Sequence, residues 1–123
     1  MKVLIVDDSA VMRRVLKGAM AQCGITDVDE SSDGSLGVSA ASESNYDIIL
    51  MDWNMPTMLG IDAVRAIRAM GKTVPIIMVT TEAEKSRIVE AIQAGASNYI
   101  IKPFDSKTIL AKIKETIAVA AAK

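Results

Sequence analysis

The sequence predicts an α/β fold in which helices cover both faces of a parallel β-sheet. Short apolar runs alternate five times with stretches of helical periodicity, and the connections between them are short. Each apolar run stops at polar or turn-forming residues, as is typical of strands buried between two layers of helices. The prediction is therefore a doubly wound sheet of five strands with five helices, forming one domain over residues 1–123.

The first half of the chain supplies three strands and two helices. Two strands are rich in Val, Ile, Leu and Met, whereas the second is polar enough to suit a sheet edge. The first helix carries apolar residues at helical spacing, can be capped by Asp7-Asp8-Ser9, and is followed by a typical stop, Gly24. In chain order, the predicted elements are strand 2–6, helix 11–20, strand 25–30, helix 35–44 and strand 48–51.

Glycine and cap residues divide the second half of the chain. Gly71 and Gly95 each follow an apolar-periodic stretch, which predicts a helix end at both positions. Asp105 or Ser106 can cap the last helix, whose apolar residues share one face. In chain order, the predicted elements are helix 61–70, strand 75–79, a helix around Ile88, Val89 and Ile92, strand 98–101 and a helix from 106 to 123.

Composition excludes several functional classes. Apolar residues make up 50% of the chain and aromatic residues only 3%, so aliphatic side chains and Met must fill the core. The net charge of −1 argues against nucleic acid and polybasic membrane contacts as partners. Cys23 is the only cysteine, which fits a reducing, cytoplasmic location, and we expect it to be a small core residue. The apolar run at 3–6 is too short for a signal peptide or a membrane span.

Reactive side chains follow four of the predicted strands. Asp7 and Asp8 follow the first strand, Asp52 the third, Thr80 ends the fourth, and Lys102 follows the fifth. If these strands are neighbours, their carboxyl ends place all five groups in one crevice. Clustered carboxylates repel, so either one of them is protonated or a cation binds them, and among cations Mg²⁺ suits oxygen ligands. A strand-end aspartate can bind the metal, accept a phosphoryl group, or do both.

Each of these residues has an ordinary explanation when it is considered alone. An acidic pair can simply cap a helix, a threonine is a common strand residue, and a lysine is usually solvated. The combination of all four kinds of group, each at the end of a different strand, is what favours a phosphoryl-transfer site. The chain has no histidine, so catalysis by its own histidine and a histidine-ligated metal are excluded.

Four motifs of the chain carry a resemblance to a known family. They are Val6-Asp7-Asp8-Ser9, Met51-Asp52-Trp53-Asn54-Met55-Pro56, Thr80-Thr81-Glu82, and Ala94-Gly95-Ala96 leading to Lys102-Pro103-Phe104. Over nearly its whole length the chain resembles the receiver domains of bacterial two-component response regulators, and within them the single-domain chemotaxis type. The resemblance implies a flavodoxin-like sheet with strand order 2-1-3-4-5 and no output domain.

The resemblance also implies a role for each matching residue. Asp52 accepts a phosphoryl group from a histidine of a partner kinase, Lys102 pairs with that group, and Thr80 hydrogen-bonds it. Asp8 and Asp52 bind Mg²⁺ through side chains, Asn54 through its carbonyl, and Asp7 through metal-bound water. The implied metal set is therefore Asp7, Asp8, Asp52 and Asn54.

The resemblance extends to partners and to the switch. Tyr99 changes rotamer together with Thr80, the Lys102-Pro103 peptide bond is cis, and Lys85 borders the partner face. The implied partners are a histidine kinase as donor, an output target such as a flagellar motor switch protein, and a phosphatase. The implied protein is a monomer that is not an enzyme beyond its own phosphorylation and dephosphorylation.

One position departs from the family pattern. Thr81 stands where the family more commonly has Ala or Gly, whereas Asn54 and Glu82 match the chemotaxis type.

Three alternative functions compete with the function that the resemblance implies. A haloacid dehalogenase-type phosphohydrolase would have an acid in place of Asn54 and a cap domain. A flavodoxin-like FMN binder would need a hydroxyl- and glycine-rich loop where Asp7 and Asp8 stand. A stand-alone phosphorelay receiver, which passes its phosphoryl group to another protein, remains open.

Overall fold

The computed structural model describes residues 1–122 and contains the ten predicted elements in the predicted order. Residue 123, the predicted end of the last helix, lies outside the described residues. The strands are β1 (Lys2–Val6), β2 (Asp27–Ser31), β3 (Ile48–Met51), β4 (Ile76–Thr80) and β5 (Asn98–Ile101). The helices are α1 (Ala10–Ala21), α2 (Gly34–Glu43), α3 (Gly60–Ala69), α4 (Lys85–Ala94) and α5 (Ser106–Ala121).

All four strand pairings are parallel, and the strand order is β2-β1-β3-β4-β5. The prediction of a doubly wound, five-stranded sheet is therefore confirmed. The register pairs Val6 with Met51 and Met51 with Met78. The residues that follow β1 and β3 consequently leave the sheet side by side at its carboxyl edge.

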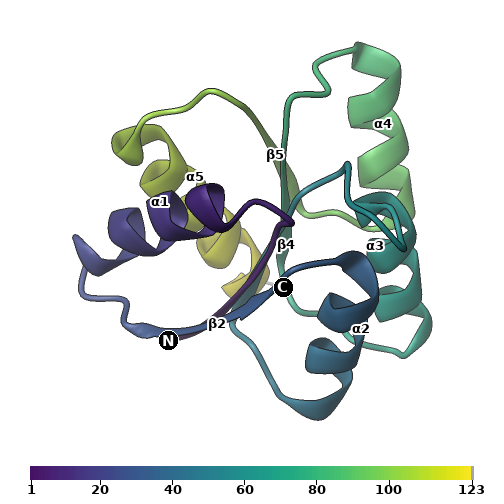
Figure 1. Ribbon diagram of the computed structural model, residues 1–123, viewed down its shortest axis with the longest axis horizontal. Coiled ribbons are helices and arrows are strands. Elements are labelled where there is room, and N and C mark those ends of the chain that lie inside the picture. The colour runs from purple at the N-terminus through teal and green to yellow at the C-terminus, as the bar shows by residue number, and fades with distance from the viewer. Residues whose placement is uncertain (123) are drawn as a thin grey trace.

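Helices cover both faces of the sheet (Figure 1), with α1 and α5 on one side and α2, α3 and α4 on the other. Alternate side chains of the central strands enter two separate buried clusters, because successive residues of a strand point to opposite faces. In β3, Ile49 and Met51 pack with the α2–α4 layer, whereas Ile48 and Leu50 pack with the α1–α5 layer. Aliphatic residues and Met dominate both clusters, as composition predicted.

Local sequence explains three of the helix starts. Ser9 accepts a hydrogen bond at Oγ from the Met12 N–H, Asp33 caps α2 through the Leu36 N–H, and Asp105 caps α5 through the Thr108 N–H. Of the two candidates for the last cap, Asp105 is thus the one used. No helix within residues 1–122 has the length and apolar character needed to cross a membrane.

Two local predictions were wrong. Strand β2 begins at Asp27 and not at residue 25, because the Ile25 N–H still donates to the carbonyl of Met20 and closes the end of α1. Cys23 is exposed and not in the core, since it lies in the connection that turns at Gly24.

Candidate functional site

Asp7 and Asp52 stand side by side at the carboxyl edge of the sheet, where β1 and β3 end. The Asp52 N–H donates to the carbonyl of Val6, and the Asp7 N–H donates to the carbonyl of Ser31, so neighbouring strands fix both backbones. Their side chains are buried, with exposed fractions of 1% for Asp7 and 8% for Asp52. Asp8, the next residue, is exposed.

Lys102 links the two buried carboxylates. Its Nζ lies 3.1 Å from Oδ2 of Asp7 and 3.4 Å from Oδ1 of Asp52. The other oxygen of Asp7 accepts from the Ser9 N–H at 2.9 Å, and Oδ1 of Asp52 accepts from the Trp53 N–H at 2.9 Å. The structure therefore brings together the ends of β1, β3 and β5, as the sequence predicted.

The charges at this edge are not balanced. Burial raises the pKa of Asp52, the nearby Asp7 carboxylate raises it further, and Lys102 opposes both effects. Asp7, Asp8 and Asp52 each offer one carboxylate oxygen, and these oxygens lie within 4.8 Å of one another. An all-oxygen, anionic set of this kind fits a hard divalent cation such as Mg²⁺. The residues present thus suit the predicted metal.

Thr80 and Tyr99, the residues predicted to form a switch, both bond to the backbone of Glu82. Thr80 is fully buried, and its Oγ1 accepts from the Glu82 N–H at 3.2 Å. Tyr99 is 8% exposed, and its hydroxyl donates to the carbonyl of Glu82. Glu82 also accepts at Oε1 from the side-chain amide of Asn54 at 3.4 Å. The loop after β4 is therefore held by a network that reaches both β3 and β5.

Arg87 of helix α4 makes a cation–π contact with Trp53, the residue after Asp52. Lys85, the first residue of α4, is exposed. The guanidinium of Arg87 lies 5.9 Å from the centre of the Trp53 ring and donates to Glu90. The only tryptophan is therefore buried next to Asp52 and covered by a cation from α4.

Close packing and an unusual turn shape the loop between β3 and α3. The Gly60 N–H donates to the carbonyl of Trp53, and a Cβ on Gly60 would lie 1.8 Å from the carbonyl oxygen of Asp52. Thr57 has a φ of 72°, and the Met58 N–H donates to the carbonyl of Pro56 at 2.8 Å, which makes a γ-turn. A β-branched residue is costly in this conformation.

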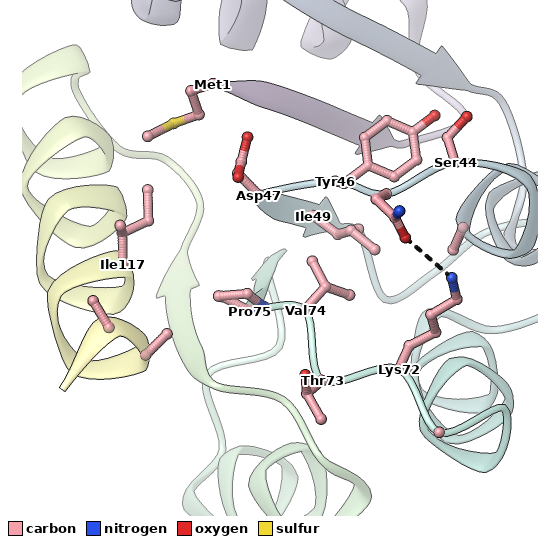
Figure 2. A pocket seen from close by; sticks show the side chains of 15 residues that line it. Met1, Ser44, Tyr46, Asp47, Ile49, Lys72, Thr73, Val74, Pro75 and Ile117 are labelled. Carbon is pink, nitrogen blue, oxygen red and sulfur yellow. Dashed lines mark hydrogen bonds between the residues drawn. The ribbon is translucent and has the colours of Figure 1, made fainter. Parts of the chain in front are cut away.

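Two features of the structure lie outside the sequence prediction. One is Arg13, which contacts the carbonyl of Asp7 and the side chain of Glu30. The other is a cavity of about 550 Å³ at the amino ends of β3 and β4, at the opposite edge of the sheet from the acidic residues. Figure 2 shows Lys72 on its wall, hydrogen-bonded to Asn45. Neither feature has a local sequence signal, because both depend on contacts between distant segments.

Comparison with known proteins extends this picture. A family model described as the response regulator receiver domain matches residues 3–114. The chemotaxis protein CheY of Pseudomonas aeruginosa is 43% identical over 117 residues, which are 94% of each chain. The chemotaxis protein CheY-3 of Vibrio cholerae is 41% identical over 115 residues, covering 92% of this chain and 88% of that protein.

Solved structures agree with the sequence relatives. The chemotaxis response regulator CheY4 of Vibrio cholerae superposes with a TM-score of 0.86 at 33% identity, covering 94% of this chain and 97% of that one. The receiver domain of the Francisella response regulator 1452 gives a TM-score of 0.89 at 25% identity, covering 97% of this chain and 98% of that one.

Proposed function

The chain belongs to the family of response regulator receiver domains, and from this membership we propose that it is a chemotaxis switch phosphorylated on Asp52. The observation that supports the choice of Asp52 is its place between Asp7 and Lys102, with Asp8 completing an acidic cluster. Asp52 is the acid that directly ends the central strand β3. The kinase side chain that donates the phosphoryl group must be a histidine of another molecule, since this chain has none.

The proposed reaction is a transfer between two side chains. A carboxylate oxygen of Asp52 attacks the phosphorus of a phosphohistidine, a P–O bond forms, and the P–N bond breaks so that the imidazole leaves with its electron pair. Lys102, already 3.4 Å from Asp52, donates to the phosphoryl oxygens as their charge develops. The Thr80 hydroxyl supplies a second donor at the same edge. Mg²⁺, when bound, neutralises charge on the phosphoryl group and the carboxylates.

The hydrogen bonds of the acids suggest how they share a metal. Both oxygens of Asp7 already accept bonds, from the Ser9 N–H and from Lys102. Asp7 is therefore suited to act on Mg²⁺ through a bound water. Asp8 and Asp52 would bind directly through side chains, and Asn54 would bind through its backbone carbonyl.

Phosphorylation of Asp52 would change the conformation of the protein through the hydrogen bonds that Glu82 makes with Thr80 and Tyr99. A phosphoryl group carries about −1.5 to −2 charge, so Thr80 must turn toward it and give up its bond from the Glu82 N–H. Tyr99, which donates to the same residue, would then move and change the surface near Lys85. A partner that prefers the moved state must raise phosphorylation in return.

The proposed partners follow from this switch. A histidine kinase is the donor, a flagellar motor switch protein is the output target, and a phosphatase ends the signal. We propose that residues 1–123 act in the cytoplasm as a monomeric receiver without a substrate beyond its own aspartyl phosphate. Mass spectrometry and gel filtration of the phosphorylated protein would test the oligomeric part of the proposal.

Labelling with radioactive acetyl phosphate and Mg²⁺, and with labelled phospho-kinase, tests the acceptor. The wild type should take up one phosphoryl group, and Asp52→Ala should take up none. Asp27→Ala is the matched control, because Asp27 is exposed at the amino end of β2 and its side chain bonds to nothing within residues 1–122. Stoichiometric labelling of Asp52→Ala would contradict the assignment, as would labelling that persists in EDTA.

A further inference from the structure

Arg13 fixes the backbone between two of the acidic residues. Its Nη1 donates to the carbonyl oxygen of Asp7 at 2.6 Å, and its Nε donates to Oε1 of Glu30 at 3.1 Å. One side chain of α1 thus joins the loop after β1 to the edge strand β2. The side chain of Arg13 is only 17% exposed, so this contact is partly shielded from water.

Asp8 depends on this contact more than the other acids do. The carboxylates of Asp7 and Asp52 are held by Ser9, Trp53 and Lys102, whereas the Asp8 side chain has no hydrogen-bond partner within residues 1–122. Hydrogen bonds therefore restrain the Asp8 carboxylate only through its backbone, which fixes the position of its Cα–Cβ bond. Because a peptide unit is planar, a bond to the Asp7 carbonyl also fixes the N–H and the Cα of Asp8.

Glu30 restrains the side chain of Arg13 even when no cation is bound. Its two carboxylate oxygens accept from Arg13 and from Lys17, each at 3.1 Å, and these cations hold the pKa of Glu30 below its usual value. A free arginine side chain has considerable rotamer entropy to lose when it is held in one conformation. Because Glu30 already restrains it, the bond from Arg13 to Asp7 is made at a smaller entropic cost.

We propose that Arg13 is a positioning residue for the cation site, acting through the Asp7–Asp8 peptide. The brace formed by Glu30 and Arg13 holds that peptide so that the Asp8 carboxylate stays close to Asp52. Arg13 contacts Asp7 through its backbone carbonyl and not through its carboxylate. The inference deepens the proposed function, since it rests on Mg²⁺ as the cation that these acids bind.

Simple electrostatics predicts the opposite effect, which makes the proposal testable. Removing a positive charge near an acidic cluster should tighten the binding of a cation. Loss of positioning should instead weaken it. Arg14 provides a matched control, because it is the next residue, carries the same charge, is exposed, and has no side-chain partner within residues 1–122.

Mg²⁺ titration followed by Trp53 fluorescence separates these effects. Arg13→Gln should raise the dissociation constant about tenfold, as loss of an outer partner of a metal ligand commonly does. Arg14→Gln should leave the constant unchanged or slightly lower. Glu30→Gln should weaken binding less than Arg13→Gln, and Lys17→Gln should have little effect because the Arg13–Glu30 bond remains. Equal constants for Arg13→Gln and Arg14→Gln, or tighter binding by Arg13→Gln, would overturn the proposal.

A measurement without metal keeps the inference separate from the proposed function. In EDTA, amide exchange of Asp7 and Ser9 should be severalfold faster in Arg13→Gln than in the wild type, and unchanged in Arg14→Gln. Exchange in the core strands should be the same in all three proteins. If the wild type failed to bind Mg²⁺, the proposed metal would be wrong, and this exchange pattern would still support the brace. Unchanged exchange at both amides would reject it.

Discussion

The hydroxyl of Tyr99 donates a hydrogen bond to the backbone carbonyl of Glu82, which ties β5 to the loop after β4. Burial and the nearby Glu82 carboxylate raise the pKa of Tyr99 to about 12. Burial and the bond to Asp29 raise the pKa of Tyr46, the other tyrosine, to about 12 as well.

These pKa values predict a loss of stability in alkali. In the unfolded chain both tyrosines ionise near pH 10, so the unfolded state releases its protons first. The stabilisation is complete below that pH and is lost as the pH rises from about 10 to about 12. Absorbance of tyrosinate in the native protein should show midpoints near pH 12, and Tyr99→Phe should reduce the alkaline loss of unfolding free energy. Native midpoints near 10 would refute this.

The close packing around Gly60 predicts that one added methyl group will strongly lower the free energy of unfolding. A Cβ at this position would meet the Asp52 carbonyl oxygen at 1.8 Å, so Gly60→Ala must displace the acceptor loop. We expect a loss of about 3 kcal/mol in urea unfolding. Gly18 lies within α1, where an added Cβ would meet no atom within 4 Å, so Gly18→Ala should gain about 0.5–1 kcal/mol. Similar effects at the two glycines would contradict the packing at Asp52.

Thr57 predicts a gain in stability from a change near the site. Its φ of 72° is costly for a β-branched residue, whereas Gly, which has no Cβ, adopts a positive φ readily. Thr57→Gly should therefore raise the free energy of unfolding by up to about 1 kcal/mol. Thr73→Gly, in an exposed loop position without a positive φ, should not raise it. A loss of stability in Thr57→Gly would show that the threonine side chain matters more than its backbone strain.

Thr81 predicts a change in the lifetime of the phosphorylated form. It is exposed directly after Thr80, beside the bonded pair Asn54 and Glu82 that should flank the attacking water. A stiff β-branched side chain occupies space that Ala leaves open. Thr81→Ala should speed the decay of the aspartyl phosphate by about 2- to 10-fold, or roughly 0.4–1.4 kcal/mol of barrier. A decay as slow as that of the wild type, or slower, would instead favour a hydroxyl that helps to orient the water.

The sequence predicted the layers of the fold because hydrophobic periodicity and strand-end residues are local signals. The run from Ile48 into Asp52 identified both the central strand and the acid at its end. Convergence of Asp52 with Asp7 and Lys102 then followed from parallel strands ending at one edge. The strand order itself came from family resemblance, since no local signal distinguishes one parallel neighbour from another.

Other features depend on tertiary contacts and could not be predicted locally. Val11 and Val15 continue the apolar spacing of α1 yet are 67% and 50% exposed, because only the side of the helix that faces the sheet is covered. The role of Arg13 requires Glu30 on β2, and nothing near Arg13 distinguishes it from Arg14. The strained backbone of Thr57 could not be predicted, since sequence alone does not reveal a positive φ.

The division of the interior into two clusters has a thermodynamic consequence. Leu16 and Ile67 lie in different clusters, on opposite faces of the sheet, and the two clusters have no residue in common. Large-to-small substitutions at these two positions should therefore add to within about 0.5 kcal/mol. Non-additivity is expected instead between residues at the carboxyl edge, where Lys102 contacts the ends of both β1 and β3. Double-mutant cycles would then locate energetic coupling between the two faces at the edge of the sheet and not in its packed interior.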